Sequence, residues 1–94
     1  MARSQILPAA ERDLIDLFAT RLDYSDAAAV RFADLVAEAV GRLEAWPESG
    51  PLHPHLGGGS RVLHLNRVRA TLYYVVSEDE DEAVVTVLRV LRQE

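Results

Sequence analysis

Between Ala29 and Leu43 an apolar side chain returns every three or four residues, and this spacing restricts the backbone more than any other feature of the sequence. The apolar positions 29, 32, 33, 36, 40 and 43 fall on one face of an α-helix, and charged residues occupy the other face. Ser25 is placed to cap the start of this helix, and Pro47 disfavours helical geometry at Trp46. The pattern predicts an amphipathic helix that ends near Trp46 and buries one face against another layer.

A second helix is predicted just before the first. Pro8 suits the first position of a helix, and from Ala9 to about Leu22 leucine or phenylalanine recurs every four residues. The connection at residues 23–25 is so short that the two helices should form an antiparallel hairpin. The short apolar-leaning stretch Ser4–Leu7 is expected to form a strand ahead of them.

The second half of the chain reads as a loop followed by strands. Prolines and glycines concentrate in the predicted loop, Pro47–Gly59. Three runs rich in apolar, β-branched and aromatic residues follow it: Arg61–Leu65, Val68–Val76 and Ala83–Leu91. Asn66-Arg67 suits a tight turn because asparagine tolerates positive φ, and Ser77–Glu82 is expected to be a charged turn. The sequence predicts one α+β domain over residues 1–94, with the helical hairpin packed on a C-terminal antiparallel meander.

Strand alternation predicts a sheet that is apolar on both faces. Val85, Val87 and Leu91 would share one face of the last strand, and Val84, Leu88 and Val90 the other. The helical hairpin covers only one face, so either a partner or the loop and termini must cover the second.

Charge is unevenly distributed along the chain. Its 94 residues include 10 basic and 15 acidic side chains, all the basic ones being arginine, for a formal charge of −5. Residues 1–48 carry −4, residues 49–77 carry +3 and residues 78–94 carry −4. Net acidity argues against holding long nucleic acid by bulk charge, but the middle third is a basic segment inside an acidic chain.

Several classes of chemistry find no support in the sequence. Cysteine is absent, which removes disulfides, thiolate metal sites and thiol nucleophiles. His53, His55 and His64 have no clustered ligands to complete a metal site, so we expect neither a metal nor a cofactor. Neither a signal peptide nor a membrane-spanning run is present, and a cytoplasmic protein is expected.

Four stretches of the chain carry a family resemblance: LPAAERDLIDLF (7–18), AAAVRFADLVAEAVGRLEAWPESG (27–50), SRVLHLNRVRATLYYVV (60–76) and VLRVLRQ (87–93). Together they resemble the RelE/ParE superfamily of toxins from type II toxin–antitoxin systems, most closely its ParE branch. The resemblance implies a non-enzymatic toxin that inhibits DNA gyrase by binding. It also implies a cognate antitoxin of the ParD type with a ribbon-helix-helix part that binds DNA. The toxin would contact operator DNA only indirectly, through this antitoxin.

Residues for these contacts are predicted from their positions. Arginines on the strands and turns, with one tyrosine, are the candidates for target contact: Arg61, Arg67, Arg69, Tyr73, Arg89 and Arg92. Apolar hairpin residues are the candidates for the antitoxin groove: Leu17, Phe18, Val36 and Val40.

Two alternatives stay open. In a ribosome-dependent mRNA endoribonuclease of the RelE type, Arg61, Arg69 and Arg89 would bind the scissile phosphate, and His64 or Tyr73 would assist proton transfer. A degenerate toxin would only bind its antitoxin. The absence of lysine, Tyr74 where arginine is common in the family and Arg92 where histidine is common weaken the ribonuclease interpretation.

Overall fold

A computed structural model describes residues 1–53 and 58–93 of the chain. The helices and strands occur in this order: β1 (Arg3–Ile6), α1 (Pro8–Tyr24), α2 (Asp26–Ala45), β2 (Arg61–Leu65), a 3₁₀ turn η1 (Asn66–Val68), β3 (Ala70–Asp79) and β4 (Glu82–Arg92). The middle of the predicted loop, which includes His55, lies outside the described residues.

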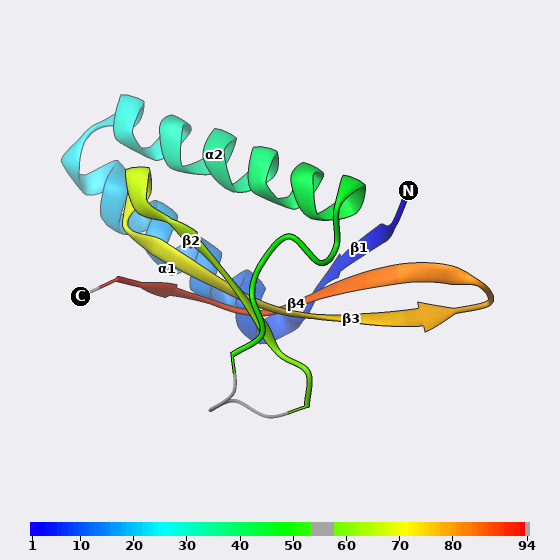
Figure 1. The fold of residues 1–94 in the computed structure, drawn as a ribbon. Coiled ribbons are helices and arrows are strands. Elements are labelled where there is room, and N and C mark those ends of the chain that lie inside the picture. The colour runs from blue at the N-terminus through cyan, green and yellow to red at the C-terminus, as the bar shows by residue number, and fades with distance from the viewer. Residues whose placement is uncertain (54–57, 94) are drawn as a thin grey trace.

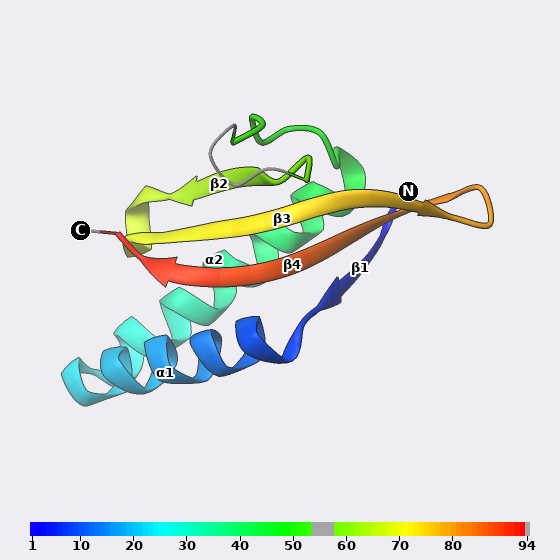
Figure 2. The ribbon, with the colours of Figure 1, turned by 90° about the horizontal axis from the view of Figure 1, so that it is seen from below.

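The fold has two layers, as predicted from the sequence. Its sheet has four strands in the order β1-β4-β3-β2, in which β1 runs parallel to β4 and the other neighbours are antiparallel. α2 crosses one face of the sheet, and α1 lies alongside β4 (Figures 1 and 2). Buried residues from α1, α2 and the strands form the hydrophobic core between the layers.

Both helices begin and end close to the predicted positions. Pro8 occupies the first turn of α1, and the Ser25 hydroxyl accepts a hydrogen bond from the Ala28 N–H at 3.0 Å to cap α2. α2 ends at Ala45, with Trp46 as its C-cap. Ala29, Phe32, Val36 and Leu43 are buried, which confirms the face read from their spacing.

A β-bulge in β4 makes the predicted alternation of this strand wrong. Tyr74 pairs with Val87 and Tyr73 with Arg89, so Leu88 is an extra residue without its own partner. After the bulge Val90 joins Val85 and Val87 in the core, and Leu91 turns to the other face. Because of the bulge, valines that precede it and the valine that follows it all face the helices.

The two turns of the meander also differ from the sequence prediction. Residues 66–68 form the 3₁₀ turn, and the residue with positive φ is Arg69, at 53°, because it caps that turn. At the other end, β3 and β4 extend into the acidic run. The turn itself is only Glu80 and Asp81, at φ of 51° and 67°. These longer strands form an arm that projects beyond the rest of the sheet (Figure 2).

Exposed apolar surface lies mainly on the helices rather than on the sheet. Val62 and Val84, on the face away from the helices, are 5% and 2% exposed. Among the described residues, Leu91 is the only strand residue among the large apolar side chains that are exposed. Of the two alternatives left open for this face, cover from within the chain is therefore favoured over most of the sheet. Within the described part of the chain, neither helix is long and apolar enough to cross a membrane.

The loop after α2 is attached to the sheet at Gly50. The Gly50 N–H donates to the Tyr74 hydroxyl at 2.9 Å, and Arg61 donates to the Gly50 carbonyl at 2.8 Å. A Cβ at Gly50 would lie 2.4 Å from the Val62 carbonyl oxygen and 2.7 Å from the Tyr74 hydroxyl. Tyr74 is fully buried, so it stands in the core and holds this loop.

We expect Gly50→Ala to destabilise the fold by about 2 kcal/mol, because the added methyl group overlaps backbone and a buried ring. Gly41→Ala is the matched control, since a Cβ there meets nothing within 4 Å and alanine is favoured inside a helix by about 0.5–1 kcal/mol. Denaturant unfolding of both variants measures the difference. Equal stabilities would contradict the close packing at Gly50.

Candidate functional site

An apolar groove runs between α1 and α2. Its volume is about 660 Å³, and its lining is almost entirely hydrocarbon. Residues from both helices, together with Ile6 of β1, form it: Ile6, Leu14, Ile15, Phe18, Ala19, Leu22, Phe32, Ala33, Val36, Ala37, Val40, Gly41 and Glu44. Of the residues predicted for an antitoxin groove, Phe18, Val36 and Val40 line it, whereas Leu17 packs against the core instead.

The depth of the groove follows from side-chain size. α2 places the small residues Ala33, Ala37 and Gly41 along it, one turn apart, while α1 contributes the large side chains Ile15 and Leu22. Ile15 is 66% exposed and Leu22 is 47% exposed. An apolar surface of this kind left in water usually marks a binding site, because covering it removes hydrocarbon from water.

The groove has little charge of its own. Glu44 is the one ionisable residue in its lining, and its carboxylate accepts a hydrogen bond from the Ser4 hydroxyl at 2.8 Å. The surface therefore offers shape and hydrocarbon rather than directed polar contacts. It suits the apolar face of an amphipathic helix.

Arg89, one of the predicted target-contact residues, is tied to α1. Its guanidinium donates to both oxygens of Asp13, at 2.7 and 2.9 Å, and the Val90 N–H donates to the same carboxylate at 3.0 Å. The side-chain hydrogen bond from Arg89 lowers the pKa of Asp13 most. The backbone hydrogen bond from Val90 and the positive charge of Arg89 lower it further. Arg89 thus fastens the first helix to the sheet.

Arg61 and Tyr73 are also in contact with the protein itself. Arg61 donates to the carbonyl oxygens of Glu48 and Gly50. Tyr73 is half-buried, and its ring meets that of His53 edge-on at 6.3 Å. Tyr73 also borders a hollow that it shares with Arg92 and Gln93, whereas Arg61 lies away from the end of the sheet where the remaining candidates gather.

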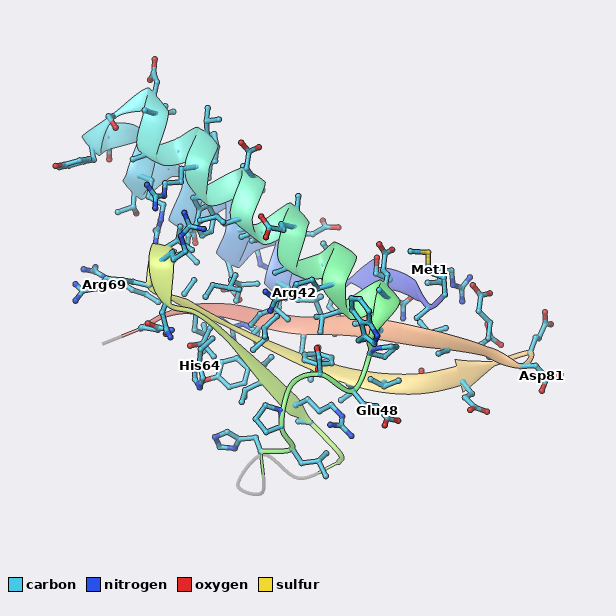
Figure 3. All side chains as sticks on the ribbon, turned by 45° about the horizontal axis from the view of Figure 1, so that its top comes forward. Met1, Arg42, Glu48, His64, Arg69 and Asp81 are labelled. Carbon is cyan, nitrogen blue, oxygen red and sulfur yellow. The ribbon has the colours of Figure 1, made fainter. Side chains whose placement is uncertain are left out.

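Arg67, Arg69 and Arg92 lie at that end, around η1 and the last residues of β4. All three are exposed, and Arg69 projects outward from the turn in Figure 3. Arg67 borders two hollows that also contain carboxylates, those of Asp34 and Glu38. The six predicted residues therefore do not form one site.

Sequence reasoning missed two features of these surfaces. Ile15 and Leu22 extend the groove, and the apolar repeat of the first helix carried the signal for both. The ion pair between Asp13 and Arg89 joins residues 76 positions apart, so no local sequence pattern could predict it.

Comparisons with known proteins agree with this geometry. The chain matches the profile of the family described as ParE toxin of type II toxin-antitoxin system, parDE, over residues 5–94. A solved chain from the chromosomal ParDE TA system of P. aeruginosa has the same fold, with a TM-score of 0.81 and 21% sequence identity. The alignment covers 100% of this chain and 98% of that one. No curated protein sequence gives a significant match.

The two-layer fold and the groove define a small α+β protein with an apolar groove along its helical hairpin. The chain belongs to the ParE family of toxins from type II toxin–antitoxin systems.

We expect Asp13→Asn to lower the melting temperature by several degrees at pH 7, because the amide keeps the shape of the carboxylate but loses its charge. Asp13 has a lowered pKa when folded, so its ionised form stabilises the protein above the unfolded pKa of about 3.9. That contribution is lost as the pH falls through the lower folded pKa. The difference between variant and wild type should then shrink towards zero.

Thermal unfolding followed from pH 7 to pH 2 measures this difference. Asp16→Asn, on the same helix and exposed, is the control and should change little across this range. A gap between wild type and Asp13→Asn that stays constant on acidification would contradict the assigned role.

Proposed function

We propose that this chain is a toxin that inhibits DNA gyrase by binding it and that a cognate antitoxin of the ParD type holds it inactive. Membership of the ParE family supports the toxin role. The observation that carries the antitoxin part is the apolar groove between α1 and α2. Any contact with operator DNA would be made by the ribbon-helix-helix part of the antitoxin.

The groove fits the apolar face of a partner helix. Leu14 and Phe18 form one wall and Val36 and Val40 the other, one turn apart on each helix. A partner helix with apolar side chains every three or four residues would match both rows. Its polar face would remain in water, as expected for a segment that orders only on binding.

The hydrogen bonds that the arginines make within the protein favour a non-enzymatic toxin over a ribonuclease. Arg61 is bonded to loop carbonyls and Arg89 to Asp13, which leaves only Arg69 of the three residues proposed to hold a scissile phosphate. His64 shares a hydrogen bond with the Thr71 hydroxyl at 3.0 Å. These contacts support structural roles for Arg61, Arg89 and His64, three of the residues that RNA cleavage would use.

For the groove, we expect Ala37→Glu to weaken binding of the antitoxin at least ~10-fold, since the partner helix would have to bury a carboxylate against hydrocarbon. Ala37 is exposed and helical, so the variant should fold. Ala27→Glu, equally exposed and in the first turn of α2 but outside the groove, is the control. Calorimetry with the antitoxin encoded beside the toxin measures both affinities, and equal affinities would remove the groove from the interface.

For the target, we expect the folded chain to suppress supercoiling by purified DNA gyrase when present in stoichiometric excess. Prior mixing with the antitoxin should restore supercoiling. Normal supercoiling in the presence of the free toxin would overturn gyrase as the target. Cleaved transcripts soon after induction would then favour the ribonuclease, and harmless expression would favour a degenerate toxin.

A further inference from the structure

Three arginines that are far apart in the sequence meet at one end of the molecule. The Arg21 guanidinium, from α1, donates to the carbonyl oxygen of Val68, the residue before Arg69. The Arg69 carbonyl accepts a hydrogen bond from the N–H of Gln93, the residue after Arg92, at 2.8 Å. We call Arg21, Arg69 and Arg92 the basic end.

The charges of the basic end lie close enough to act on one another. Burial is the main cause that lowers the pKa of Arg21, and the charge of Arg92 lowers it further. Within residues 1–53 and 58–93, the side chains of Arg69 and Arg92 make no hydrogen bond or ion pair. The guanidinium groups of Arg69 and Arg92 are therefore available to a ligand, beside the fixed charge of Arg21.

The backbone at Arg69 points to a role for its side chain. Arg69 has a φ of 53°, a left-handed conformation that glycine or asparagine adopts with less strain. Hydrogen bonds from the Arg69 N–H to Asn66 and from Gln93 to the Arg69 carbonyl hold it there. Strained residues that their surroundings hold in place often serve a function, and here the strain presents a guanidinium at the tip of the turn (Figure 3).

Arg21 contributes a fixed positive charge to the basic end. Its guanidinium lies 4.4 Å from the centre of the Phe32 ring and also donates to the Leu17 carbonyl at 3.1 Å. These contacts hold the guanidinium in place and use its donors, so Arg21 adds charge rather than a direct hydrogen bond to a ligand. Direct contacts fall to the exposed guanidinium groups of Arg69 and Arg92.

Opposite charge lies at the other end of the molecule. The arm between β3 and β4 carries five consecutive acidic residues, Glu78–Glu82. Figure 3 shows Asp81 and Arg69 at opposite ends of the fold, whose longest dimension is 42 Å. Such a separation of charge orients a protein in the field of a polyanion, with its basic end forward.

We propose that the basic end binds the phosphodiester backbone of a nucleic acid. The net charge of −5 limits this to a local, end-on contact with few phosphates rather than a long binding track. The inference rests on the proposed function for its physiological setting, in which the DNA held by gyrase supplies the phosphates. Single-stranded RNA offers the same chemistry and is the second source to test.

Binding of labelled duplex DNA and single-stranded RNA to the free toxin, measured over a range of salt concentrations, tests the proposal. For Arg69→Ala with Arg92→Ala, we expect weaker binding and a plot of log K against log salt that is flatter by about 1.8 on duplex DNA or about 1.4 on RNA. The polymer that the wild type binds, and on which the double variant shows this loss, identifies the source. Arg69→Lys with Arg92→Lys, which keeps both charges, should restore most of the slope.

Arg3→Ala with Arg12→Ala is the matched control. It removes the same net charge from exposed positions, and Arg3 pairs with Asp79 on the acidic arm at the opposite end. The control should bind as wild type does. Equal losses in the two alanine pairs, or no binding of either polymer by the wild type at low salt, would overturn the proposal.

Gyrase assays separate this inference from the proposed function. Full inhibition by Arg69→Ala with Arg92→Ala would overturn the role of the basic end while leaving gyrase as the target. Salt-dependent nucleic-acid binding that is lost in this variant, with no gyrase inhibition by the wild type, would support the basic end and reject the target.

Discussion

The hydrogen bonds that Arg89 and the Val90 N–H donate to the Asp13 carboxylate fix the position of α1 on the sheet. β1 ends at Ile6, although β4 continues to Arg92, so the edge of β4 lacks a neighbouring strand beyond that point. The Leu7 N–H still donates to the Val87 carbonyl, and the Asp13 carboxylate then accepts the Val90 N–H. α1 therefore continues the edge that β1 leaves open, and its position determines how far it lies from α2.

The bulge at Leu88 makes that arrangement compatible with a continuous core. In a regular strand of the same sequence, without the bulge, strict alternation would turn Val90 away from the helices because Val85 and Val87 face them. With it, all three pack in the core, and Arg89 lies just after the bulge, where it reaches Asp13. One irregularity thus supplies both the packing and the ion pair that holds α1.

The sequence predicted what depends on local periodicity and missed what depends on pairing across the fold. Ser25, Pro8 and the apolar repeats define both helices, and the apolar, β-branched and aromatic runs define the meander. The bulge has no local signature, because it follows from which residues of β3 and β4 pair. For the same reason the predicted target residues separated: Arg89 and Arg61 are bound to Asp13 and to the loop, contacts that no pattern within either segment specifies.

Phe32 connects the two surfaces on which the proposals depend. One part of its side chain lines the apolar groove, while the Arg21 guanidinium lies over its ring. A helix seated in the groove would therefore contact the residue that supports the fixed cation of the basic end. Gly41 and Glu44, at the far end of the same groove, lie near the C-terminus of α2, so the groove runs along most of the hairpin. An antitoxin that fills it would therefore lie next to Phe32 and would leave Arg69 and Arg92, which are not part of the groove lining, uncovered.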